Sequence, residues 1–164
     1  MENIQTVEIL IAVIVAYIAI QNYRLSKNQL KLQLFEKRYT LYASLKNLFK
    51  HINIEAAIDS VAYRVFKIET NEAHWFFDSD VVDYLEEAGD KAWKLYKLSQ
   101  KLHNHELSTG EERTKAAFEA EETCKWFYDQ YESADKIFTP YFEFTGMTLG
   151  KIKKRFLSSW IDKK

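Results

Sequence analysis

The stretch Ile9–Ile20, ILIAVIVAYIAI, decides how this chain is built, because its twelve residues carry no polar group except the Tyr17 hydroxyl. A helix needs about 20 residues to cross a hydrocarbon core of about 30 Å, and runs of about 10–14 residues are ambiguous. Ile4 and Val7 extend the run upstream, and Tyr17 and Tyr23 suit a membrane interface. The extended run therefore predicts a membrane span. The predicted anchor residues are Ile9, Leu10, Ile11, Val13, Ile14, Val15, Tyr17, Ile18 and Ile20.

Two other interpretations of this run compete with a membrane span. A cleaved secretory signal needs a positively charged start and a small-x-small cleavage site. The residues before the run include Glu2 and Glu8 but no Lys or Arg, and Ala16–Ala19 does not form such a site. Cleavage is therefore not expected. A buried helix in a soluble bundle stays open as an alternative, because the uninterrupted run is short.

The charges on either side of the run predict its orientation. Arg24, Lys27 and Lys31 follow the run. The only charged groups before the run are acidic side chains and the amino terminus. Basic flanks of a membrane span stay on the cytoplasmic side. We therefore expect a single-pass protein of the bacterial inner membrane, with its N-terminus outside and its C-terminal domain in the cytoplasm. Arg24, Lys27 and Lys31 would then contact the membrane surface.

The composition indicates one ordinary helical domain behind the anchor. The length of 164 residues suits a single domain. With 23 basic and 24 acidic residues, the net charge of −1 argues against a general nucleic-acid binder, and no nucleic-acid partner is expected. The lone Cys124 fits a reducing compartment without disulfides. Four Gly and one Pro leave little room for hairpins, which favours an all-α fold.

Apolar residues at helical spacing predict the remaining helices. No Gly or Pro occurs from Leu25 through Phe49, so the membrane helix is expected to continue into the domain. The inner face of a second helix is predicted to be Ile54, Ile58, Val61, Val65 and Ile68. A third, capped by Asp78 or Ser79, would bury Val82, Leu85, Ala88, Ala92, Leu95, Ser99 and Leu102. A fourth, ended by Thr139 and Pro140, would bury Ala117, Ala120, Cys124, Phe127, Tyr131, Ala134 and Phe138.

The predicted fold is thus an N-terminal transmembrane helix continuous with an antiparallel four-helix bundle. The expected divisions are an anchor over residues 1–24, a cytosolic bundle over 25–145 and a basic amphipathic tail over 146–164. In that tail, Leu149, Ile152, Phe156 and Trp160 recur at helical spacing. The tail is expected either to lie on an anionic membrane surface or to cap the open end of the bundle. Its predicted membrane-surface residues are Lys151, Lys153, Lys154, Arg155 and Trp160.

Few residues in the sequence suggest chemistry. The chain has no phosphate loop, dinucleotide fingerprint, G-x-S-x-G or H-E-x-x-H motif. His103, His105 and Glu106 form a short patch that lacks a further ligand for a closed metal site. Cys124 lies on an apolar face, which favours an inert thiol over a nucleophile. We therefore expect no catalytic residue, cofactor or metal.

Aromatic clusters suggest where a partner could bind. Three adjacent aromatic residues on a helix cannot all face inward, and such groups occur at Trp75-Phe76-Phe77 and Trp126-Phe127-Tyr128. Trp75 and Trp126 are therefore candidates for a partner surface.

Several stretches carry a resemblance to a known family. They are KLQLFEKRYTLY at 31–42 after the N-terminal span, FFDSDVVDYL at 76–85, Trp126-Phe127 and FTPYF at 138–142. With these, the chain resembles an uncharacterised family of small bacterial membrane-anchored helical proteins. The resemblance implies a single N-terminal span with a cytosolic helical bundle, and it implies no activity. The general plan is also similar to that of membrane effectors of bacterial antiphage systems that respond to nucleotide signals.

Two functions follow as expectations. The first is a non-enzymatic, inner-membrane-anchored interaction or scaffold module that binds membrane lipids and assembles with itself or with a protein partner. The second is a ligand-gated membrane effector of antiphage-type defence, in which a nucleotide signal rearranges the bundle.

Overall fold

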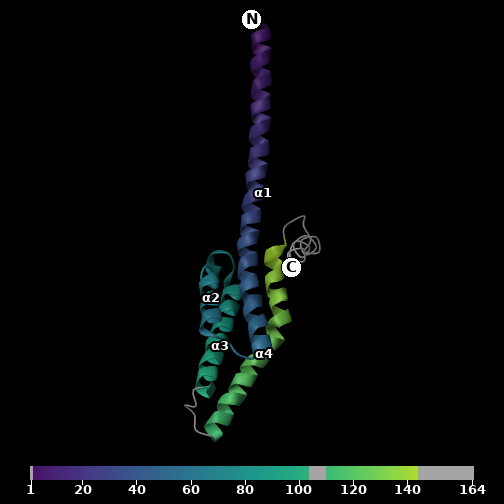
Figure 1. Cartoon of the computed structure of the whole chain (residues 1–164). Coiled ribbons are helices and arrows are strands. Elements are labelled where there is room, and N and C mark those ends of the chain that lie inside the picture. The colour runs from purple at the N-terminus through teal and green to yellow at the C-terminus, as the bar shows by residue number, and fades with distance from the viewer. Residues whose placement is uncertain (1, 104–109, 144–164) are drawn as a thin grey trace. The chain divides into compact units, whose positions relative to one another are not determined.

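The computed structural model describes residues 2–103 and 110–143, with side chains from Val7 onward. Over these residues the chain forms four α-helices and a short 3₁₀-helix and no strand (Figure 1). The elements are α1 (Glu2–Glu55), α2 (Ser60–Thr70), η1 (Ala73–Trp75), α3 (Ser79–His103) and α4 (Glu111–Phe142). The all-α prediction is therefore confirmed. The predicted basic tail helix and its residues Lys151, Lys153, Lys154, Arg155 and Trp160 lie outside the described residues.

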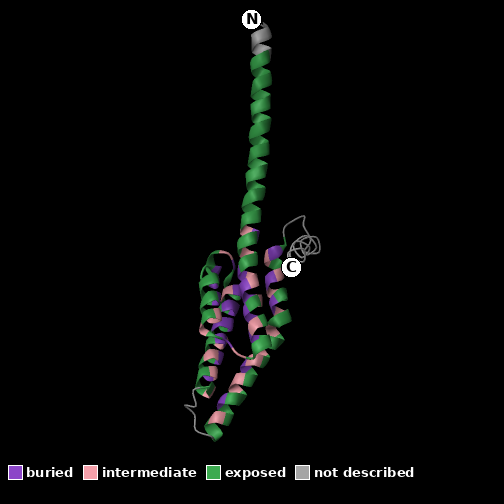
Figure 2. Ribbon diagram, in the orientation of Figure 1, coloured by how far each residue is buried: buried purple, intermediate pink, exposed green. Residues whose placement is uncertain are grey.

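The chain divides into two compact units, residues 1–37 and residues 38–164. In the first unit every side chain from Val7 to Gln33 is exposed (Figure 2). This part of α1 is long and apolar enough to cross a membrane, and none of its apolar window is buried. No side chain of the described N-terminal unit covers this segment, and the alternative of a helix buried in a soluble bundle stays a prediction.

The second unit has a hydrophobic core to which α1, α3 and α4 each contribute. Fully buried members include Phe49 and Leu45 of α1, Leu95 of α3, and Phe127 and Phe138 of α4. The rings of Phe49 and Phe127 lie 5.3 Å apart in an edge-on arrangement. Helix α3 packs against α4, α2 and η1. In the ribbon of Figure 2 the buried residues, in purple, lie mainly where these helices adjoin one another.

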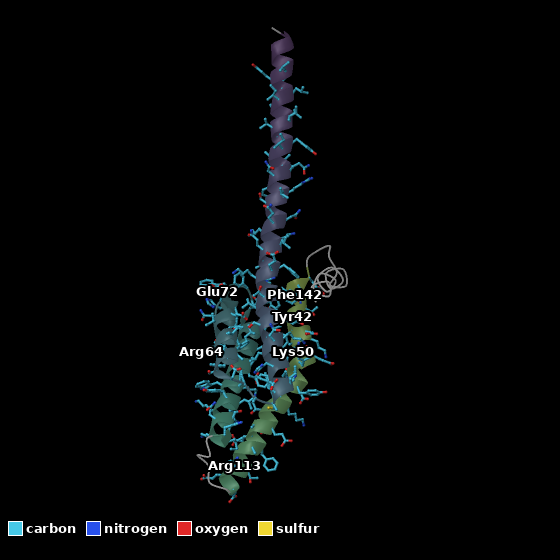
Figure 3. All side chains as sticks on the ribbon, viewed as in Figure 1. Tyr42, Lys50, Arg64, Glu72, Arg113 and Phe142 are labelled. Carbon is cyan, nitrogen blue, oxygen red and sulfur yellow. The ribbon has the colours of Figure 1, made fainter. Side chains whose placement is uncertain are left out.

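Contacts between α1 and α4 continue along both helices. Tyr42 lies beside Phe138 and Phe142, with ring centroids 5.4 and 5.5 Å away (Figure 3). One to two turns further along α1, Phe49 contacts Trp126 and Phe127 of α4. Because aromatic rings bury large apolar areas and prefer such tilted arrangements, these contacts hold the two helices together.

The predicted inner face of the second helix is wrong. Of its members only Ile58 is buried, whereas Ile54, Val61, Val65 and Ile68 are exposed. Ile54 belongs to the end of α1 and Ile58 lies in the connection at 56–59, so the stripe does not belong to one helix. The buried side of α2 is instead formed by Phe66 and Thr70.

The predicted end of the fourth helix and parts of its inner face also need correction. Helix α4 passes Pro140 and ends at Phe142. Proline removes a hydrogen bond to the preceding turn, but only two residues of the helix follow Pro140, and the last of them, Phe142, is buried. Ala117 and Tyr131 are exposed, and the neighbouring Ala116 and Thr123 are buried instead.

Candidate interaction surface

Helix α2 begins at a strong local signal, the carboxylate of Asp59. Its Oδ1 accepts hydrogen bonds from the backbone N–H groups of Val61 and Ala62, both at 2.7 Å. These groups have no partner within the helix, so the carboxylate supplies what the first turn lacks. The bonds from Ala62 and Val61 and the nearby His51 lower the pKa of Asp59.

The inner side of α2 is held against α3. Phe66 is 2% exposed. The ring of Tyr63 lies 5.1 Å from the ring of Trp93, which in turn stacks on Tyr96 at 5.3 Å. Gly89 of α3 lies next to Phe66, since a Cβ at this position would be in ordinary van der Waals contact with Phe66 Cε1 at 3.5 Å. This packing fixes which side of α2 faces solvent.

The opposite side of α2 carries an apolar stripe. Val61 is 62% exposed, Val65 45% and Ile68 73%. We call these three residues the outer face of α2. Soluble proteins expose single apolar residues routinely, but a row of three on successive turns of one helix is a feature of contact surfaces.

The two tryptophans that the sequence singled out differ in their surroundings. Trp75, the last residue of η1, is 76% exposed, and its ring contacts His74 at 4.5 Å. Trp126 is half-buried, in an aromatic cluster with Phe49 at 6.0 Å and Tyr84 at 6.3 Å. The ammonium of Lys91 lies 5.0 Å from the Trp126 ring centroid. Trp75 is thus free to contact a partner, whereas Trp126 holds α1, α3 and α4 together.

A second surface feature is a shallow groove between the end of α1 and α4. It is lined by Ile52, Asn53 and Ala56 on one side and by Phe118 and Tyr128 on the other. Phe118 is 65% exposed and Tyr128 72%. Cys124 also lines the groove, and its thiol donates a weak hydrogen bond to the Ala56 carbonyl at 3.5 Å. Burial raises the pKa of the Cys124 thiol, which disfavours the nucleophilic thiolate.

A guanidinium joins the chain segments at one end of the second unit. Arg38 donates to the Phe76 carbonyl at 2.9 Å and to the Tyr141 carbonyl at 3.1 Å. Its guanidinium also lies 5.3 Å from the Tyr141 ring centroid. The Tyr141 hydroxyl donates to Asp80 at 2.8 Å and to Asp78 at 3.0 Å. These bonds tie α1, the start of α3 and the end of α4, so Arg38 has a structural role.

A second polar cluster joins α1 to α4. The Tyr42 hydroxyl donates to Asp135 Oδ1 at 2.6 Å, and Lys46 lies 3.0 Å from the same oxygen. Lys46 also donates to the Tyr131 carbonyl at 2.6 Å. Burial and the hydrogen bond to Asp135 raise the pKa of Tyr42 well above its ordinary value. The cluster therefore links α1 to α4 through Tyr42, Lys46 and Asp135.

The remaining predicted residues divide between the described chain and the rest. The anchor residues and Arg24, Lys27 and Lys31 are all exposed. His103 contacts the Ser99 carbonyl of its own helix at 3.1 Å, and its sequence neighbours His105 and Glu106 lie outside the described residues. Within residues 2–103 and 110–143, no three His, Cys, Asp or Glu side chains are grouped to hold a metal ion.

The described residues thus offer three separate surface features: the apolar outer face of α2, the exposed Trp75, and the α1–α4 groove, whose lining also includes Glu121, Glu122 and Lys125. The outer face was missed from the sequence, because its residues were assigned to the core. Comparison with protein-family models, with curated proteins and with solved structures finds no match to this chain.

Proposed function

We propose that this protein is a non-enzymatic interaction module anchored in the bacterial inner membrane by the first part of α1. One observation carries the proposal. The apolar side chains from Val7 to Ile20 are each 50–65% exposed in the structure. Burying a Val, Leu or Ile side chain is worth about 1.5–3 kcal/mol, so leaving such a row in water is costly. A lipid bilayer would cover all sides of this helix at once.

The basic residues after the apolar run support an orientation with the second unit in the cytoplasm. Arg24, Lys27 and Lys31 are exposed and follow the run within the same helix. Lys and Arg next to a span favour the cytoplasmic side and attract anionic lipid headgroups. In this orientation the second unit would present its surface directly below the membrane.

The cytosolic part would be an antiparallel four-helix bundle. The order of the contacts supports this, since Tyr42 pairs with Phe142 and the later Phe49 pairs with the earlier Phe127. Such a bundle is a rigid support for partner-binding residues, here the outer face of α2 and Trp75.

Membrane fractionation of a charged variant tests the anchor. The double variant Ile11→Lys/Ile14→Lys places two charges one turn apart in the run. A Lys at the centre of a span costs about 2.5–3.5 kcal/mol on insertion scales, so we expect most of the variant to leave the alkali-resistant membrane fraction. The matched control is Ile54→Lys/Phe118→Lys, in which both replaced residues are exposed apolar side chains of the second unit.

We expect the control to stay in the membrane fraction with the unmodified chain. The proposal is wrong if the unmodified full chain is recovered entirely in the soluble fraction without detergent.

A further inference from the structure

The outer face of α2 has the spacing of a coiled-coil contact. Val61, Val65 and Ile68 are separated by four and three residues, the spacing of the d, a and d positions of a heptad. The next position in this series is Glu72, which follows the end of α2 (Figure 3). The apolar contact would therefore be limited to Val61–Ile68.

Charged residues flank this face on both sides. With Val65 at position a, Arg64 takes position g and Glu69 position e. Both side chains are exposed, and Figure 3 shows Arg64 extending from α2. In a parallel two-stranded coiled coil, a g residue lies opposite the e residue five positions later in the partner helix. Arg64 and Glu69 are five positions apart and opposite in charge, so the face is complementary to itself.

We propose that α2 is a dimerisation helix that binds the outer face of α2 in a second copy of this chain. The proposal rests on the proposed function in one respect. Copies anchored in the same membrane lie on the same side of it and meet at a raised effective concentration, and a parallel pairing of two α2 helices sets Arg64 against Glu69 of the second copy. Because Phe66 and Tyr63 pack on the side of α2 that faces α3, the outer face of α2 stays exposed to solvent.

The proposed contact between the two α2 helices is small, and we expect it to hold two copies together only when both are confined to the same membrane. Helix α2 has 11 residues, and a stable protein interface buries about 800 Å² per partner, more than three aliphatic side chains supply. Confinement to a membrane raises the effective concentration of the second copy, which strengthens weak contacts without new ones. We therefore expect dimers in membranes that dissociate on dilution in detergent.

Cysteine crosslinking in membranes tests where the two copies meet. The full chain carrying Cys124→Ser and Ile68→Cys is oxidised in isolated membranes, and we expect a disulfide-linked dimer. The matched control carries Cys124→Ser and Phe118→Cys, a similarly exposed apolar position on α4. We expect at least fivefold less dimer from this control. Equal or stronger crosslinking at Phe118→Cys would place the contact elsewhere and overturn the proposal.

Charge reversal tests the pairing itself. In the Ile68→Cys chain, Arg64→Glu or Glu69→Arg alone would set like charges against each other, and we expect each to reduce the dimer several-fold. The double reversal Arg64→Glu/Glu69→Arg should restore it. The proposal is overturned if the single reversals leave the dimer unchanged or if the double reversal fails to restore it.

Membrane fractionation of the same samples separates the two proposals. A chain that fractionates with membranes but gives no dimer contradicts the dimerisation helix alone. A chain found only in the soluble fraction contradicts the anchor, whatever the crosslinking shows.

Discussion

At the scale of single residues, Arg38 links distant segments at one end of the second unit. Its guanidinium is the donor for two backbone carbonyls of distant segments, at Phe76 and Tyr141. The last carbonyls of a helix lack partners within the helix, so the bond to Tyr141 also completes the end of α4. Lysine carries the same charge but has no planar fork of donors, so it cannot replace both bonds equally well.

We expect Arg38→Ala to lower the free energy of unfolding by about 2 kcal/mol, because hydrogen bonds from charged donors are worth about 1.5–3 kcal/mol each and these are only partly buried. Arg38→Lys should recover part of the loss. The measurement is urea unfolding of the detergent-solubilised full chain, followed by tryptophan fluorescence. Lys50→Ala, at an exposed position of α1, is the control and should change stability by less than about 0.5 kcal/mol. If Arg38→Ala and Lys50→Ala change the free energy of unfolding equally, the hydrogen bonds of Arg38 do not stabilise this end of the second unit.

Three tyrosines of the second unit should make its stability sensitive to alkali. Burial and the carboxylates of Asp80 and Asp78 raise the pKa of Tyr141 to about 12. Burial also raises the pKa values of Tyr42 and Tyr84 above the ordinary value of about 10. A group whose pKa is higher in the folded than in the unfolded chain stabilises the fold fully at pH values below its unfolded-state pKa. This stabilisation is lost as the pH rises through the folded-state pKa.

Stability should therefore be constant up to about pH 9 and fall as the pH rises from about 10 toward 12. Unfolding by urea at pH 9, 10 and 11 measures this, and Tyr42→Phe should make the decline less steep. Tyr128→Phe, at an exposed position of α4, should follow the unmodified chain. A free energy of unfolding that stays flat between pH 9 and 11 would contradict the assignment.

At the scale of elements, Gly89 is the residue of α3 that lies against Lys67 and Phe66 of α2. A Cβ at this position would lie 3.4 Å from Lys67 Cδ and 3.5 Å from Phe66 Cε1, which are ordinary contact distances. A glycine within a helix costs about 1 kcal/mol relative to alanine. We therefore expect Gly89→Ala to stabilise the fold by up to about 1 kcal/mol in urea unfolding. Gly89→Leu should instead destabilise it, since the larger side chain must displace Phe66. A lower free energy of unfolding for Gly89→Ala would contradict this expectation, because it would mean that the Cβ does not fit between α2 and α3.

The positions of the helices could be predicted from the sequence better than the side of each helix that faces the core. The apolar run at 9–20 and the scarcity of Gly and Pro are local signals, and they sufficed for the all-α fold and the exposed N-terminal helix. The side of α2 that faces inward was not predictable in this way. Val61, Val65 and Ile68 form the more regular stripe, but Phe66 fits against Gly89, a residue that only the three-dimensional packing brings near.

The candidate surface was predictable to a similar degree. Three consecutive aromatic residues force one outward, so the exposure of Trp75 follows from local geometry. The same reasoning did not place Trp126, because the rings of Phe49 and Tyr84 that surround it come from distant parts of the chain.

At the scale of the whole molecule, the exposed apolar segment of α1 is followed in the chain by a small helical unit that carries exposed apolar residues. The large apolar side chains from Val7 to Ile20 are exposed, which is unfavourable in water. The outer face of α2 is also exposed, and we propose that a second copy binds it. Under the proposed function, lipid would cover the run from Val7 to Ile20, and confinement in the membrane would strengthen the proposed contact between two α2 helices. Each step depends on the first part of α1 crossing the bilayer with the second unit on its cytoplasmic side.

Protease protection tests that central claim most directly. The full chain, with an epitope tag at its C-terminus, is expressed in bacteria and treated with protease in intact spheroplasts and in inside-out membrane vesicles. The account predicts that the tag survives in spheroplasts and is lost in inside-out vesicles. Loss of the tag in spheroplasts and its survival in inside-out vesicles would contradict the account.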